Sequence, residues 1–164
     1  MRPSASLQIV LVTALAWPGF FREAQAGELP AAAPKFDSAL AKQVGADARG
    51  MRSYVLVILK TGPTPVAKGE KRDAMFAGHF ANMGRLAKEG KLVLAGPFEE
   101  NADGWRGLFL FSVATVEDAR ALTATDPVIV NGEMVAEFHP WYGSAAAMLL
   151  PGLHKQVTPP AAED

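Results

Sequence analysis

The chain has 164 residues, with 16 basic and 17 acidic side chains and no cysteine. The absence of cysteine excludes thiol nucleophiles, thiolate zinc sites and iron–sulfur clusters. The formal net charge of −1 offers no basic surface for nucleic acid or for anionic lipid, so neither is expected as a partner.

The first 26 residues have the three parts of a secretory signal peptide. Arg2 supplies the positive charge, Leu7–Ala16 is an uncharged apolar run, and Ala24–Ala26 forms an A-x-A cleavage site. An uncleaved membrane anchor is the alternative, but a spanning helix needs about 20 apolar residues and Arg22 follows the run too soon. We therefore expect cleavage, export to the periplasm or the medium, and no membrane attachment of the mature chain. That chain, of roughly 138 residues, has the size of a single domain.

Residues 27–50 are predicted to form a linker followed by a short amphipathic helix over Phe36–Val44. The β-branched and aromatic residues of Arg52–Lys60 predict the first strand. From Glu70 to Glu89 the apolar spacing becomes helical, and Gly90 is well placed to end that helix. One stripe of this helix carries Met75, Phe76, His79, Phe80, Met83, Leu86 and Ala87.

The second half of the chain predicts three more strands and one more helix. The strands are expected at Lys91–Phe98, at Trp105–Val113 and from Glu133 to Pro140, and a capping box opens the helix at Thr115–Ala124. The order β-α-β-β-α-β is the split βαβ arrangement of the ferredoxin-like α+β fold. The tail, residues 145–164, is rich in Pro and Ala and is predicted to be disordered.

The first and third strands are apolar on both faces. In the third strand, regular alternation places Trp105 with Phe109 on one face and Leu108 with Leu110 on the other. Two helices can cover only one face of a four-stranded sheet, so the other face needs a partner. We expect a homodimer joined sheet to sheet, in a dimeric α+β barrel. The alternative is that the N-terminal helix or the tail covers this face within one chain.

Two residues are candidates for proton transfer. His79 lies on the apolar stripe of its helix and is expected to face the sheet. Histidine suits this chemistry because its unperturbed pKa, about 6.5, lies close to neutral pH. Asp126 precedes Pro127 directly after a helix, where it could orient the imidazole. The structural alternatives are a hydrogen-bonded core histidine and an aspartate that only shapes a turn.

Other polar residues carry weaker hypotheses. Arg106 is predicted to share a strand face with Leu108 and Leu110, and it could either bind an anionic substrate group or reach water as a strand-end charge. Glu137 and His139 share one face of the last strand, but their spacing gives little support for a metal site with His79. No cofactor is expected, and haem ligation by a histidine has no support in the spacing.

The chain resembles the YciI-like (YCII-related) proteins from about Met51 to Ser144, and we assign residues 51–144 to this domain. The resemblance is carried by a histidine in the first long helix, an AGP strand end and a late Asp-Pro pair. Because short intracellular members begin near Met51, a misassigned start is an alternative to the signal peptide. The matching residues here are His79, Leu86, Gly90, Lys91, Leu92, Ala95, Gly96, Pro97, Asp126, Pro127 and Gly132.

The resemblance implies a dimeric α+β barrel in which His79 and Asp126 meet in a cleft as a catalytic acid–base pair. Gly96, Pro97 and Arg106 are the candidate substrate-binding residues, and Arg106 is expected to face a carboxylate of a small-molecule substrate. A related member is a dehydrochlorinase, so we expect a cofactor-free lyase or isomerase acting on a small organic acid or phenol. The alternative is a non-catalytic dimeric module that binds a small ligand or a partner.

Overall fold

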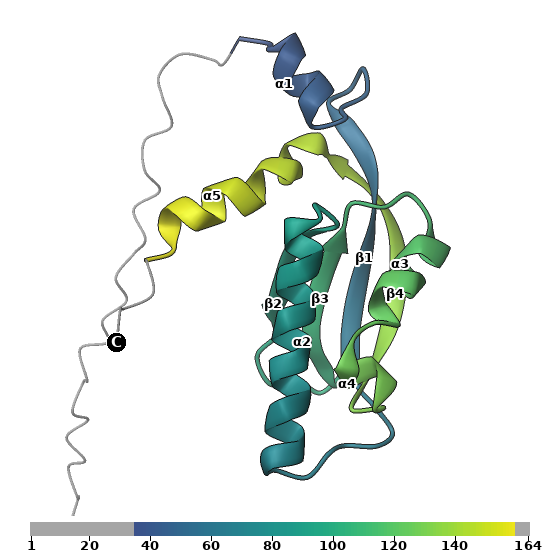
Figure 1. Ribbon diagram of the computed structural model, residues 1–164. Helices are drawn as coiled ribbons and strands as arrows, with labels where there is room; N and C mark the ends of the chain where they lie inside the picture. Colours follow the sequence, from purple (N-terminus) through teal and green to yellow (C-terminus); the bar gives the residue numbers. More distant parts are fainter. Residues whose placement is uncertain (1–34, 160–164) are drawn as a thin grey trace, which may run out of the picture. The chain divides into compact units, whose positions relative to one another are not determined.

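The structure is a computed structural model that describes residues 35–159 (Figure 1). The predicted signal peptide, the start of the linker and the last five residues lie outside this range. No helix within the described residues is long and apolar enough to cross a membrane. The elements in chain order are α1 (Ser38–Gln43), β1 (Met51–Thr61), α2 (Glu70–Lys88), β2 (Leu92–Pro97), β3 (Trp105–Phe111), α3 (Val116–Thr123), α4 (Pro127–Val130), β4 (Met134–Ser144), the 3₁₀ helix η1 (Ala145–Leu149) and α5 (Leu150–Val157).

The four strands form one antiparallel sheet in the order β2-β3-β1-β4. Helices α2, α3 and α4 lie over one face of this sheet (Figure 1). This is the ferredoxin-like α+β arrangement, so the predicted fold class is confirmed. The short helix α4 was not predicted, because its four residues follow the Asp126-Pro127 pair that the sequence presents only as a break.

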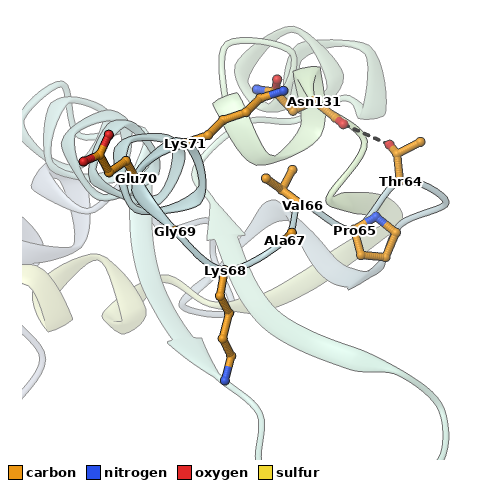
Figure 2. Close-up of a pocket in the computed structure, with 9 residues that line it drawn as sticks. All are labelled: Thr64, Pro65, Val66, Ala67, Lys68, Gly69, Glu70, Lys71 and Asn131. Atoms are coloured by element: carbon orange, nitrogen blue, oxygen red, sulfur yellow. Dashed lines mark hydrogen bonds between the residues drawn. The ribbon is translucent and has the colours of Figure 1, made fainter.

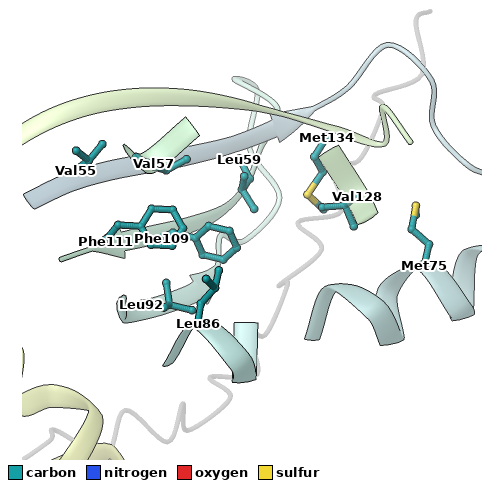
Figure 3. Packing of buried hydrophobic residues seen from close by; sticks show 11 residues of the cluster. Val55, Val57, Leu59, Met75, Leu86, Leu92, Phe109, Phe111, Val128 and Met134 are labelled. Carbon is teal, nitrogen blue, oxygen red and sulfur yellow. The ribbon is translucent and has the colours of Figure 1, made fainter. Parts of the chain in front are cut away.

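The main core fills the space between the sheet and the helices. Val55, Val57 and Leu59 of β1 face it, and Phe109 and Phe111 of β3 pack beside them (Figure 3). These residues alternate along their strands, as expected for one face of a pleated sheet. The helices complete the cluster with Met75, Leu86, Ala119 and Val128, and the neighbouring strands with Leu92 and Met134.

A β-bulge at the start of β3 changes which side of the sheet its first side chains face. Leu59 pairs with Gly107, but the next residue of β1, Lys60, pairs with Trp105, so Arg106 is the extra residue. The bulge inverts the alternation predicted from the sequence. Trp105 therefore shares the face of Leu108, opposite to the prediction, and Arg106 is turned towards the helices.

The face opposite the helices is partly covered by the chain itself. Tyr54, Val93 and Leu110 form a second buried cluster, against which Ala147 and Met148 of η1 pack. The Tyr54 hydroxyl also donates a hydrogen bond to the Ser144 carbonyl, at 2.9 Å. Large apolar side chains elsewhere on this open face remain exposed: Leu94 by 45%, Trp105 by 39%, Val135 by 44% and Trp141 by 43%.

The predicted disorder of the tail does not hold for residues 145–157, which form η1 and α5. The Ser144 side chain caps η1 by accepting a hydrogen bond from the Ala146 N–H. Ala145 is buried, and its N–H donates to the Gly50 carbonyl at 2.9 Å. Small apolar side chains and a nearby buried tyrosine thus give this Ala-rich segment a surface to pack on, which composition alone does not reveal.

Candidate functional site

The site is built around His79 on the inner face of α2. His79 is 7% exposed and lies one turn after buried Met75 and two turns before buried Leu86. Three aromatic rings surround the imidazole. Phe109 of β3 is stacked at 6.0 Å between ring centroids, Phe76 meets it edge-on at 6.0 Å, and the exposed Phe80 lies at 5.3 Å.

Asp126 meets His79 from the junction between α3 and α4. The Nδ1 atom of His79 lies 2.9 Å from Oδ1 and 2.8 Å from Oδ2 of Asp126, which is 1% exposed. Asp126 is also the N-cap of α4, since its Oδ1 accepts the Val128 N–H at 3.1 Å. The same carboxylate therefore begins a helix and fixes the imidazole.

Close contact between α2 and α4 sets this geometry. A Cβ atom at Gly78 would lie 3.0 Å from Cγ of Pro127, so glycine lets the first residue of α4 approach α2. Pro127 fits at this first helical position because its missing N–H needs no partner there. Gly78 and Pro127 are the chain neighbours of His79 and Asp126, and this contact holds the pair together.

The hydrogen bond determines which nitrogen can react. An ionised carboxylate can only accept, so Nδ1 of His79 carries the proton and Nε2 of the neutral ring has a free lone pair. Within the described residues Nε2 of His79 has no hydrogen-bond partner. Arg52 Nε is the one side-chain nitrogen or oxygen among these residues that is both fully buried and without a partner. Nε2 is therefore not completely buried, although His79 as a whole is only 7% exposed.

A second polar cluster lies where β4 begins, on the same side of the sheet. Glu133 is 1% exposed, and its Oε2 accepts the Val66 N–H at 2.6 Å. Its Oε1 accepts a hydrogen bond from Arg72 of α2 at 3.0 Å and lies 3.6 Å from Arg106 Nη2. Burial favours the neutral acid, but these hydrogen bonds and both guanidinium charges hold the pKa of Glu133 below its ordinary value.

Glu133 is not among the site residues predicted from the sequence. Acidic side chains next to a glycine in a loop usually face water, and nothing in the sequence separates this one from its neighbours. Its burial follows from close packing of two backbone segments. A Cβ at Gly62 would lie 2.2 Å from the Gly132 carbonyl oxygen, so the loop after β1 packs directly against the residue before Glu133.

The remaining predicted site residues do not gather around His79. Gly96 pairs with Leu108 on the open face, and Pro97 pairs with Gly107 at the end of β2. Arg106 does not share a face with Leu108 as predicted, because the bulge turns it towards Glu133.

The metal site considered from the sequence, with His79, Glu137 and His139 as ligands, does not form. Glu137 and His139 bind each other at 2.9 Å on the open face, away from His79 on the helix side. Within residues 35–159 no group of histidine, aspartate or glutamate side chains is arranged to hold a metal ion.

One surface pocket of the described residues lies away from the His–Asp pair. It has a volume of about 580 Å³ and is formed by residues 64–71 and Asn131, with a hydrogen bond from the Thr64 hydroxyl to the Asn131 carbonyl (Figure 2). None of its lining residues belongs to the pair. It does include Val66, which links this loop to Glu133.

These features define a ferredoxin-like α+β domain with a buried His–Asp pair on the helix side of its sheet. Residues 53–141 match the model of the YCII-related domain, and the chain belongs to this family. The resemblance predicted from the sequence is thereby confirmed.

A search of curated proteins finds no match. Among solved structures, the chain is similar to 5-chloro-2-hydroxyhydroquinone dehydrochlorinase of Burkholderia phenoliruptrix, determined in complex with 2,5-dihydroxybenzoquinone. The identity is 17% and the TM-score 0.42, over 54% of this chain and 92% of the other.

Proposed function

We propose that the domain is an acid–base enzyme in which Nε2 of His79 accepts a proton from a small organic acid or phenol. The observation that carries this proposal is the position of Nδ1, 2.8 and 2.9 Å from the two Asp126 oxygens. This contact fixes the tautomer and stabilises the imidazolium that forms when Nε2 takes the proton.

Removal of a substrate proton by Nε2 is the first step of two classes of reaction, isomerisation and elimination. In an isomerisation, the C–H or O–H electron pair moves into the substrate π system and Nε2 returns the proton at another atom. In an elimination, the same pair forms a double bond while a leaving group departs with its own electrons. Either reaction needs only a base, and positioned acid–base catalysis supplies about 10²–10⁴-fold acceleration. Substrates with already acidic protons, such as activated rings, are therefore favoured.

His79→Asn is the sharpest test. The Asn amide nitrogen lies close to the position of Nδ1 and can still donate to Asp126, but the variant has no atom equivalent to Nε2. We expect it to fold as the wild type does and to show no turnover. Assays should use a panel of chlorinated and hydroxylated aromatic acids and phenols, beginning with 5-chloro-2-hydroxyhydroquinone and scored by product formation and by deuterium uptake from D₂O. The catalytic role of His79 would be excluded if His79→Asn turned over every accepted compound at the wild-type rate.

The burial of the pair favours one alternative function. With His79 at 7% and Asp126 at 1% exposure, the hydrogen bond could serve only to join α2 to α4 in a binding module. In that case His79→Asn and His79→Ala would differ in melting temperature, because only alanine leaves the buried carboxylate without its partner. Neither variant would then alter any reaction.

We also propose that two chains associate through their open faces. Trp105 and Trp141 lie on this face near opposite ends of the sheet, and they are 39% and 43% exposed. Trp141→Glu should convert a dimer to a monomer in light scattering, whereas Val130→Glu, at a 70% exposed site on α4, should leave the mass unchanged. A wild-type monomer at all concentrations would contradict this proposal.

We also propose that the chain is exported. A cofactor-free reaction suits a compartment outside the cytoplasm, and cleavage of the predicted signal peptide near Ala26 would give a mature chain that begins at Gly27. Intact mass of the chain recovered from periplasm or medium tests this directly. A chain that keeps its first 26 residues, or one that begins near Met51, would contradict it.

A further inference from the structure

We propose that Arg72 and Arg106, anchored by Glu133, form a binding subsite for the carboxylate of a planar aromatic substrate. This inference rests on the proposed function and names the anionic group of the substrate. It adds Arg72 and Glu133 to the site.

Glu133 is the anchor of the subsite. One of its oxygens accepts a backbone N–H from Val66 at 2.6 Å, which fixes the carboxylate independently of the arginines. The other oxygen faces Arg72 Nη2 at 3.0 Å and Arg106 Nη2 at 3.6 Å. Two guanidinium groups from different elements, α2 and the β3 bulge, are therefore brought to one point.

The charges and donors of this cluster are not balanced. Two guanidinium cations face one carboxylate, so the group keeps a positive charge. Each guanidinium has five N–H donors, and among the described residues only one N–H of Arg72 makes a hydrogen bond. The side chains of Arg72 and Arg106 remain 28% and 31% exposed. Their free donors can therefore bind an incoming carboxylate in the bidentate geometry that guanidinium groups favour.

Aromatic rings connect this cluster to His79. The Arg72 guanidinium lies 4.5 Å above the Phe76 ring, and Phe76 meets the imidazole edge-on with ring centroids 6.0 Å apart. On the sheet side, Arg106 is three residues before Phe109, which is stacked on the same imidazole. Phe76 thus contacts both the Arg72 guanidinium and the imidazole, and a flat ring that packs against these aromatic side chains would bring its carboxylate to the arginines.

Titration with benzoate tests the subsite, with benzyl alcohol as the uncharged comparison. Isothermal calorimetry of the full mature chain at neutral pH should show benzoate binding and no binding of benzyl alcohol. Arg72→Gln and Arg106→Gln should each weaken benzoate binding at least about tenfold, which corresponds to 1.4 kcal/mol. Arg85→Gln removes the same charge from the exposed face of α2, where Arg85 binds Glu89, and should leave binding unchanged.

Three results would overturn the inference: no benzoate binding by the wild type, unchanged affinity in both glutamine variants, or equal weakening by Arg85→Gln. If a glutamine variant does not fold, the lysine variant at that position replaces it, since lysine keeps the charge but loses the bidentate fork. Unchanged benzoate affinity in that lysine variant would also count against the subsite. His79→Asn separates this inference from the proposed function, because it should bind benzoate normally while losing turnover. Normal turnover by His79→Asn, with arginine-dependent binding, would reject the proton transfer and leave the subsite standing.

Discussion

Replacing Asp126 by asparagine is expected to move the proton of His79 from Nδ1 to Nε2 with little loss of stability. The asparagine oxygen can keep the Val128 N–H that Oδ1 now accepts at 3.1 Å, because asparagine caps helices about as well as aspartate. Its NH₂ group then takes the place of Oδ2, 2.8 Å from Nδ1. If Nδ1 kept its proton, two N–H groups would face each other at that distance, with the asparagine oxygen 2.9 Å away as a competing acceptor. We therefore expect Nδ1 to become the acceptor and Nε2 to carry the proton.

The expected losses of unfolding free energy in two Asp126 variants distinguish an effect on proton transfer from an effect on stability. Asp126→Asn should cost about 1 kcal/mol, the net worth of an ordinary hydrogen bond. Asp126→Ala removes the cap, worth about 0.5–2 kcal/mol, and leaves a buried Nδ1–H unsatisfied at about 1–3 kcal/mol. Alanine should therefore be the less stable variant in urea unfolding, although both variants lose the activated base. In hydrolase triads the same Asp-to-Asn exchange lowers turnover about 10⁴-fold because the imidazole adopts the wrong tautomer.

Nitrogen-15 NMR of the imidazole reads the tautomer directly and needs no substrate. The wild type should show a protonated Nδ1 for the neutral ring of His79, and Asp126→Asn a protonated Nε2. His139 and His154, which lie outside the pair, provide internal references whose signals should not change. A wild-type ring protonated at Nε2, or an asparagine variant that keeps its proton on Nδ1, would refute the reasoning.

Three further predictions concern stability. Gly84→Ala should stabilise the protein by about 0.5–1 kcal/mol, because it replaces a glycine in the middle of a helix. Gly78→Ala should lose that gain, because its Cβ would lie 3.0 Å from Pro127 of α4. Urea unfolding of the two variants tests this difference. The pKa of Glu133 is lower in the folded chain, so its stabilisation is complete above about pH 4.3, the ordinary glutamate value, and is lost as pH falls below it. Glu133→Gln should therefore flatten the fall in unfolding free energy on acidification, and equal slopes would refute this. Met148→Asp should lower the melting temperature because Met148 packs on the second cluster, while Leu153→Asp, 51% exposed on α5, should not.

The sequence was sufficient for the order of the main elements because each strand and each long helix carries a local signal. The β-branched and aromatic residues of β1 and the helical spacing around His79 are two such signals. The pairing of His79 with Asp126 is different, since 47 residues separate them. It was predicted from the fold and the family resemblance, not from local spacing.

What the sequence could not predict depends on contacts between distant backbone segments. The bulge at Arg106 is visible only in the register of β3 against β1, and a bulge carries no unique residue signature here. The burial of Glu133 depends on the approach of Gly62 to Gly132. The ordered tail likewise depends on the packing of Ala147 and Met148 against the cluster of Tyr54, Val93 and Leu110, which composition does not predict.

The bulge in β3 has a consequence for comparing members of this family. A member without the extra residue would keep the strand pairing of Phe109 and Phe111 but would turn its arginine to the opposite face of the sheet. Its His–Asp pair would be intact, but the Arg106 cation of the proposed subsite would be absent from the helix side of the sheet. A single insertion or deletion before Gly107 can therefore change ligand preference without touching His79 or Asp126, and an aligned arginine alone is not evidence of a shared substrate.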